Sequence, residues 1–181
     1  AAQKMYAEVA GYTVVDATTV FVTHLTEVIK AHAADLLTRQ ETQQLIDAAK
    51  EASPAVVAEL IGQTMGVGDV QKVLQNLLAE RISIRDIVAV LEALADFAPT
   101  TKDTNILTEY VRQRLGLAIC KQHVDMDGKL RVFSLAPQVE QLIVDNVRQT
   151  ELGSRLILDP KSTEKILSSV KAQMERMSQL G

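Results

Sequence analysis

The chain has 181 residues, of which 47% are hydrophobic and only 3% aromatic, so aliphatic side chains must build its core. This composition excludes a disordered chain and favours packed helices over an aromatic-rich sheet. The formal charge of -4 disfavours a general nucleic-acid binder, which usually carries a basic surface. The longest apolar runs, such as Ile87 to Leu91, are too short to span a bilayer, and the first residues lack the pattern of a signal peptide.

Helices dominate the prediction. Apolar residues at three- and four-residue spacings share one helix face, and they predict helices at about 17–37, 39–52, 54–61, 69–80, 84–97, 104–121, 137–147 and 160–177. Asp16 is suited to cap the first of these, and Thr38 with Glu41 forms a capping box for the second. Ser83 with Asp86 has the same capping pattern before the helix at 84–97, which would leave only three residues between it and the preceding helix.

The predicted β structure is minor. Residues 12–15 form a β-prone run before the first helix, and residues 156–158 form a second short strand. Asp127 and Gly128 have the signature of a tight turn, which predicts a β-hairpin over residues 123–135. The expected fold class is therefore mainly α with minor β: a helical subdomain with a winged-helix-like hairpin, flanked by partial α/β subdomains.

The residue types that usually carry chemistry do not group here. His24 and His32 are expected on the inward face of the first helix, eight residues apart, which is too far to share a zinc ion at i, i+4 spacing. Cys120 and His123 form one C-x-x-H pair without two further ligands, so a buried free thiol is expected. The run Asp125, Asp127, Gly128 fits a turn better than a calcium loop. We predict no metal, no cofactor and no enzyme activity.

A winged-helix DNA-binding regulator is the alternative function. Two helices joined by three residues, then a third helix and a hairpin, have the order of elements of that class. The candidate recognition helix at 84–97, however, sets Arg85 against Asp86, Glu92 and Asp96, so phosphates would repel it. We therefore expect no binding to nucleic acid.

Four long segments together resemble one family. This is the export-gate family of flagellar and virulence type III secretion, the FlhA and InvA group, also called FHIPEP. The segments are GYTVVDATTVFVTHLTEVI (11–29), LLTRQETQQLID (36–47), VQKVLQNLLAERISIRDIVAVLEALADFAPTTKD (70–103) and LTEYVRQRLGLAI (107–119). The sequence of residues 11–29 favours the flagellar branch. One departure is Gly62, where the family usually has proline; with its neighbours at 62–68 it predicts a soft linker.

The resemblance implies a role in protein export. Family members span the bacterial inner membrane through an N-terminal half, and their cytoplasmic half forms a ring, usually of nine subunits. That ring docks export chaperones with their substrates, and export ATPase or stalk proteins. This chain would be an internal piece of the cytoplasmic half that does not touch the membrane. It would comprise the end of the first subdomain (1–50), the helical third subdomain (51–123), and a hairpin with the start of a truncated fourth (124–181).

The resemblance also suggests site residues. Val22 and Thr23 match the rim of the family's chaperone-docking pocket. The Thr23 hydroxyl could instead bond only to carbonyls of its own helix, and the sequence leaves both possibilities open. Residues 81–96 are expected to pack on a neighbouring subunit, with Arg81, Arg85 and Asp86 setting the contact.

Overall fold

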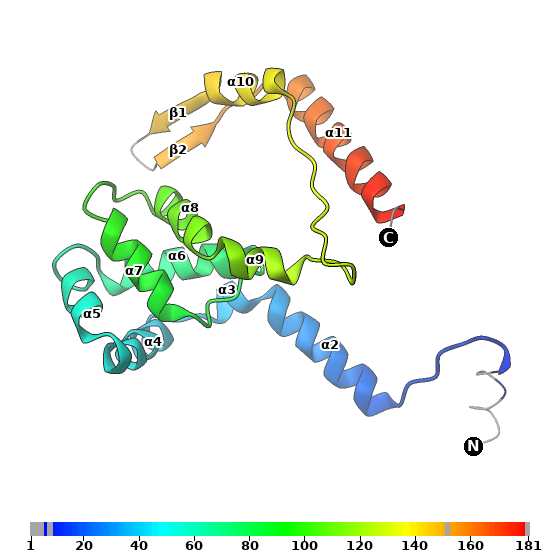
Figure 1. The fold of residues 1–181 in the computed structure, drawn as a ribbon, viewed down its shortest axis with the longest axis horizontal. Coiled ribbons are helices and arrows are strands. Elements are labelled where there is room, and N and C mark those ends of the chain that lie inside the picture. The colour runs from blue at the N-terminus through cyan, green and yellow to red at the C-terminus, as the bar shows by residue number, and fades with distance from the viewer. Residues whose placement is uncertain (1–5, 7–8, 151–152, 180–181) are drawn as a thin grey trace. The chain divides into compact units, whose positions relative to one another are not determined.

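The structure is a computed structural model that describes residues 6, 9–150 and 153–179 (Figure 1). The chain divides into two compact units, Ala1–Val88 and Ala89–Gly181, which are described separately. Helices account for nearly all regular structure in the described residues, and one two-stranded sheet accounts for the rest. The predicted fold class, mainly α with minor β, is therefore confirmed.

The first unit consists of short helices joined by tight turns. They are α2 (Ala17–Ala31), α3 (Ala33–Leu36), α4 (Arg39–Ala52), α5 (Pro54–Leu60) and α6 (Val67–Ala79). Helices α3 and α4 contact α6, and α4 also contacts α5. The fully buried aliphatic side chains lie on these elements: Ile46, Leu60, Val70, Val73, Leu74 and Leu77. The core of the unit therefore forms around α6.

Polar groups fix the entry into α4. The Leu37 carbonyl accepts hydrogen bonds from the side-chain amides of Gln71, at 2.9 Å, and Gln75, at 3.2 Å. At the next residue, the predicted capping box forms: Thr38 N–H donates to Glu41 Oε2 at 2.6 Å, and Glu41 N–H donates to Thr38 Oγ1 at 3.3 Å. Backbone groups that a helix start leaves without partners are thus satisfied.

The second unit contains the remaining elements. They are α7 (Ile87–Phe97), which begins just before it, α8 (Thr104–Arg114), α9 (Gly116–Gln122), α10 (Pro137–Asp145), β1 (Val147–Thr150), β2 (Gly153–Leu156) and α11 (Pro160–Gln179). Helices α7 and α8 meet where the rings of Phe97 and Tyr110 stack, with centroids 3.9 Å apart, and where Arg114 Nη2 lies 2.8 Å from Glu92 Oε2. Strands β1 and β2 pair antiparallel.

Several predicted helix boundaries are wrong, and two of them have a local cause. The helix predicted at 17–37 breaks at His32 into α2 and α3. The helix predicted at 104–121 breaks at Leu115, next to Gly116, whose backbone freedom disfavours a continuous helix. Helix α7 begins at Ile87, not residue 84, because Ser83 Oγ accepts from the Arg85 N–H and the predicted cap does not form. Seven residues, not three, therefore separate α6 from α7.

The predicted β elements and the linker are corrected as well. Residues 12–15 have no strand structure in the described chain, because a strand requires a partner to pair with its backbone. The turn at Gly128 forms, with a φ of 76°, but residues 123–135 contain no strand. The strand predicted at 156–158 ends at Leu156, and β1 was not predicted.

The glycine-rich residues 62–68 are not a linker either. They lie inside the first unit, where Met65 is buried and its N–H donates to the Leu60 carbonyl at 2.9 Å. Gly62 has a φ of 83°, a conformation that L side chains rarely adopt. The stretch is thus a tight turn that leads into α6.

Candidate docking surface

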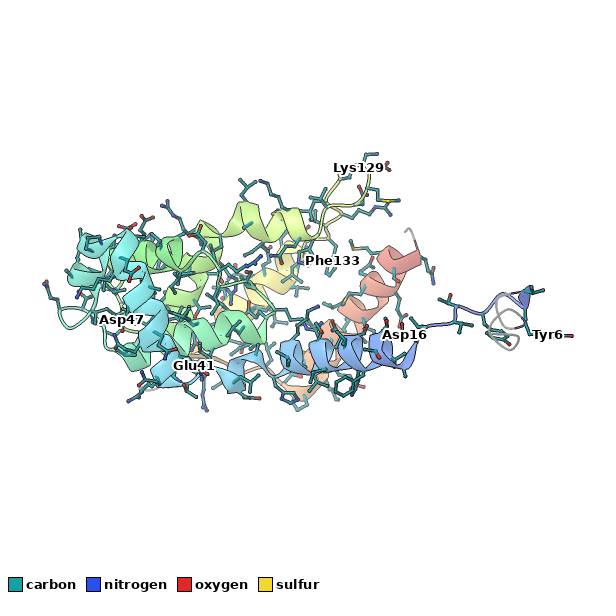
Figure 2. All side chains as sticks on the ribbon, turned by 90° about the horizontal axis from the view of Figure 1, so that it is seen from below. Tyr6, Asp16, Glu41, Asp47, Lys129 and Phe133 are labelled. Atoms are coloured by element: carbon teal, nitrogen blue, oxygen red, sulfur yellow. The ribbon has the colours of Figure 1, made fainter. Side chains whose placement is uncertain are left out.

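Helix α2 begins at a well-made cap. Asp16 Oδ1 accepts from the Thr19 N–H at 3.0 Å, and Oδ2 accepts from the Thr19 hydroxyl at 2.6 Å (Figure 2 labels Asp16 at the start of the helix). Both bonds lower the pKa of the Asp16 carboxyl below its ordinary 3.8, and the bond from the hydroxyl has the larger effect. The carboxylate also lies where the positive end of the helix dipole favours negative charge. The start of α2 is therefore defined by its own sequence.

An uncovered apolar stripe runs along α2. None of the helix residues is buried. Phe21, Leu25, Val28 and Ile29, which we call the α2 stripe, are 64%, 44%, 41% and 49% exposed. Their spacing of i, i+4, i+7 and i+8 places them on one face. Contiguous apolar surface of this kind, rimmed by polar residues, is typical of sites that bind another protein segment.

The two predicted partner-binding residues lie on α2, beside this stripe. Val22 is 54% exposed, and Thr23 is exposed as well. At about 100° per residue, Val22 borders the stripe, whereas Thr23 turns toward the polar side. Among the described hydrogen bonds, the hydroxyl that bonds to a carbonyl of this helix belongs to Thr26, which donates to Val22 O at 2.8 Å.

The predicted interface residue Arg81 has an uncommon backbone conformation. It follows the C-cap of α6 with a φ of 59°, the left-handed region in which glycine is favoured. Its N–H donates to Leu78 O, and the N–H of Ile82 donates to Leu77 O, both at 2.9 Å. These bonds and the buried Ile82 side chain form a Schellman motif, which satisfies carbonyls at the end of the helix.

The side chain of Arg81 reaches α2. Its Nη1 lies 3.6 Å from Oε2 of Glu27, whose Oε1 lies 2.9 Å from Lys30 Nζ. The Lys30 ammonium first, and the Arg81 guanidinium to a smaller extent, lower the pKa of Glu27. Sequence reasoning missed Glu27, because nothing in the local pattern indicates a partner so far along the chain.

The other predicted interface residues lie in the connection between α6 and α7. Arg85 and Asp86 are exposed. The backbone N–H of Arg85 donates to Ser83 Oγ at 3.4 Å. The structure thus joins Arg81 to α2, and it describes no such link for Arg85.

The expectations for histidine and cysteine need correction. His24 and His32 are exposed, because none of the described residues of the first unit buries α2, so the expected inward face is open to solvent. Nδ1 of His32 lies 3.3 Å from Asp35 Oδ2. Cys120 is a free thiol, as predicted, but it is exposed, not buried. Among the described residues, no group of three or more histidine, cysteine, aspartate or glutamate side chains is placed to hold a metal ion.

A second apolar surface, which sequence reasoning missed, lies between α10 and α11. A hollow of about 570 Å³ is lined mainly by apolar side chains. Its apolar lining includes Phe133, Leu135, Val139, Leu142, Ile166 and Val170. The helical periodicity of α11 predicts an apolar face, but only the tertiary structure shows that this face borders a hollow.

No helix within the described parts of the chain combines the length and apolarity that crossing a membrane requires. Helices with apolar faces open to solvent are typical of the class of protein-interaction modules. Comparison with known proteins specifies the class further: the FHIPEP family model matches residues 1–181, and the chain belongs to the FHIPEP family.

Individual relatives agree with this assignment. The flagellar biosynthesis protein FlhA of Bacillus subtilis is 46% identical over 98% of this chain, and that of Escherichia coli is 37% identical over 99%. Each alignment covers about a quarter of the relative, 26% and 25%. Among solved structures, CdsV of Chlamydia pneumoniae matches with a TM-score of 0.82 at 32% identity, over 93% of this chain and 49% of that one. Nonameric EPEC SctV-C matches with a TM-score of 0.78 at 29% identity, over 94% and 52%.

Proposed function

We propose that this chain is part of the cytoplasmic domain of a flagellar or type III protein export gate, where it serves as a docking platform. Membership of the FHIPEP family and the similarity to FlhA proteins support the proposal. The chain spans about a quarter of the length of those relatives, so the proposed export activity would belong to the whole protein and not to this chain alone. We place it at the cytoplasmic face of the bacterial inner membrane and assign it binding, not catalysis.

The α2 stripe is the observation that carries the docking role. Four large apolar side chains on one helix face are between 41% and 64% exposed. An amphipathic helix of a partner could bury such a face through contacts at matching spacing. Burial of apolar surface contributes roughly 25 cal/mol per Å², so one covering helix would gain several kcal/mol before the entropy of association is counted. The proposed partners are export chaperones carrying their substrates.

Val22 and Thr23 are the proposed contact residues for these chaperones. Val22 extends the stripe by one side chain, and Thr23 offers a hydroxyl at its edge. An apolar contact beside a polar one resembles the arrangement of protein interfaces, in which an apolar centre is bordered by a polar rim.

We further propose that the chain assembles into a ring through the connection between α6 and α7. A relative has been solved as nonameric EPEC SctV-C, and another as a complex of CdsV and CdsO. The charged side chains of Arg81, Arg85 and Asp86 would set the packing on a neighbouring subunit. Export ATPase or stalk proteins are proposed as further partners. Within the ring, residues 1–50 would belong to the end of the first subdomain, residues 51–123 to the third, and residues 124–181 to the start of the fourth.

A pull-down with purified flagellar export chaperones tests the docking role. The double variant Val22→Asp, Thr23→Asp of the cytoplasmic domain should lose at least tenfold in chaperone affinity, because it places carboxylates in an apolar contact. Gln44→Asp, an exposed polar position on α4, is the matched control and should bind as the unmodified domain does. Equal binding by all three proteins would contradict the proposal.

The regulator alternative loses its structural basis. Seven residues separate α6 from α7, and the segment expected to form the wing contains no paired strand in the described chain. A gel-shift titration with duplex DNA at two salt concentrations checks this point. Binding that weakens steeply with salt would restore the alternative.

A further inference from the structure

Arg81 occupies a backbone position that does not suit it. The Schellman motif at the end of α6 requires a left-handed residue after the C-cap, and Arg81 adopts a φ of 59° there. Glycine takes this conformation without a steric penalty, whereas any side chain with a Cβ incurs one. Local backbone preference therefore does not explain an arginine here. A residue held in an unfavourable conformation points to a role for its side chain.

That side chain connects two elements. The guanidinium of Arg81, at the end of α6, lies 3.6 Å from the carboxylate of Glu27, near the end of α2. Glu27 is also held by Lys30 one turn later, at 2.9 Å, so its carboxylate is kept on the side of the helix that Arg81 reaches. The contact spans a long stretch of chain inside one compact unit.

The direction of α2 has little apolar packing to hold it. None of its residues is buried, and α3, to which it connects at His32, is one turn long. An exposed ion pair is weak by itself. It can still determine the orientation of a helix that few other contacts hold, because a small energy difference then decides which orientation is populated.

We infer that Arg81 is a positioning residue: its ion pair with Glu27 holds α2, and the Val22 and Thr23 face on it, in one orientation relative to α3–α6. The orientation depends only on contacts within the chain. The consequence for chaperone affinity rests on the proposed function.

Replacement by glycine separates the two effects of Arg81. Arg81→Gly relieves the backbone penalty and removes the guanidinium. The thermal midpoint of unfolding should therefore stay the same or rise, while the orientation of α2 becomes less defined. A residue with a merely structural role would move stability and order in the same direction. Circular dichroism gives the midpoint and verifies that the variant folds.

Distances between spin labels report the orientation. Labels are attached at His24→Cys on α2 and Lys72→Cys on α6, both exposed, in a Cys120→Ser background that removes the exposed native thiol. Pulsed electron paramagnetic resonance at low salt should give a narrow distribution of distances between the two labels for the parent chain. Arg81→Gly should broaden it at least twofold.

Charge variants identify the ion pair as the cause. Arg81→Lys keeps the positive charge and should retain a narrow distribution, and the exchange Glu27→Arg with Arg81→Glu should restore one. Lys50→Gln is the matched control, since it removes an exposed positive charge on α4, and it should leave the distribution as narrow as the parent's. Salt at 0.5 M, where the screening length is roughly 4 Å, should broaden the parent distribution toward that of Arg81→Gly.

Two results would overturn the inference: an Arg81→Gly distribution as narrow as the parent, or an Arg81→Lys distribution as broad as Arg81→Gly. Chaperone affinity is measured on the same variants. If the parent chain binds no chaperone while the distances respond as expected, the proposed function fails and the positioning role stands. If chaperones bind and the distances do not respond, the reverse holds.

Discussion

Helices α2 and α6 lie in the same unit and have the same kind of sequence, yet their apolar faces have opposite environments. In α6, Val70, Val73, Leu74 and Leu77 are completely buried. The corresponding residues of α2 are between 41% and 64% exposed. Both helices show apolar residues at helical spacing, so periodicity identifies the face of a helix that avoids water. It does not identify what covers that face.

The contrast separates two uses of an amphipathic helix. Helix α6 uses its apolar face for the folding of its own unit, because α3 and α4 pack against it. Helix α2 keeps its face exposed, and its contacts with the unit include those with α3 and the Arg81 ion pair. Residues of equal hydrophobicity should therefore differ sharply in how much they stabilise the chain.

Truncation of one leucine on each helix gives the largest expected effect. Leu74→Ala should lower the free energy of unfolding by about 3 kcal/mol, because it removes a fully buried side chain and leaves a cavity. Leu25→Ala should cost less than about 1 kcal/mol, since Leu25 is 44% exposed before the change. Urea unfolding followed by circular dichroism measures both. Equal losses would show that the α2 stripe is covered in solution.

Loss of the helix caps should give a smaller effect of the same kind. Thr38→Ala removes the capping box of α4, which lies in the packed part of the unit, and should lower the free energy of unfolding by about 1 kcal/mol. Asp16→Ala removes the cap of α2 and should reduce helix content without moving the main unfolding transition. If the two variants shift the transition equally, α2 and α4 unfold as one cooperative element.

The smallest expected effect concerns the pKa values of the Glu41 and Glu27 carboxylates. Both have a pKa below the ordinary 4.5, Glu41 mainly through the Thr38 backbone N–H and Glu27 mainly through the Lys30 side chain. A lowered folded-state pKa means that each carboxylate stabilises the fold above pH 4.5, and that this contribution is lost as the pH falls through the folded-state pKa.

Salt should separate the two groups. An NMR titration of the side-chain carboxyl carbons should show the pKa of Glu27 rising toward 4.5 in 0.5 M salt, because its main partner is an exposed charge. The pKa of Glu41 should stay low, since a hydrogen bond from a backbone N–H is little screened. An unchanged pKa of Glu27 would mean that its ion pairs do not form in solution.

Much of the fold can be read from short stretches of sequence. The cap at Asp16, the capping box at Thr38, the whole of α4 and the starts of α10 and α11 agree with the structure. These features depend on residues within one turn of each other, so local chemistry is enough to predict them. The resemblance to the export-gate family likewise rested on continuous strings of residues, and the family match confirms it.

The errors occur where a distant contact or a competing local bond decides. Ser83 has the sequence of a helix cap but bonds to the Arg85 N–H, which delays α7 by three residues. Met65 lies among glycines yet is buried, so the expected linker is a fixed turn. Sequence spacing cannot rank such alternatives, because their energies differ by about 1 kcal/mol.

The sequence by itself determined where most helices lie, how several of them begin, and which family the chain belongs to, since each depends on neighbours in the chain. Only the tertiary structure decided that the α2 stripe is uncovered and that Arg81 meets Glu27. Those features depend on groups that folding brings together from separate parts of the chain, and no local pattern records which groups will meet.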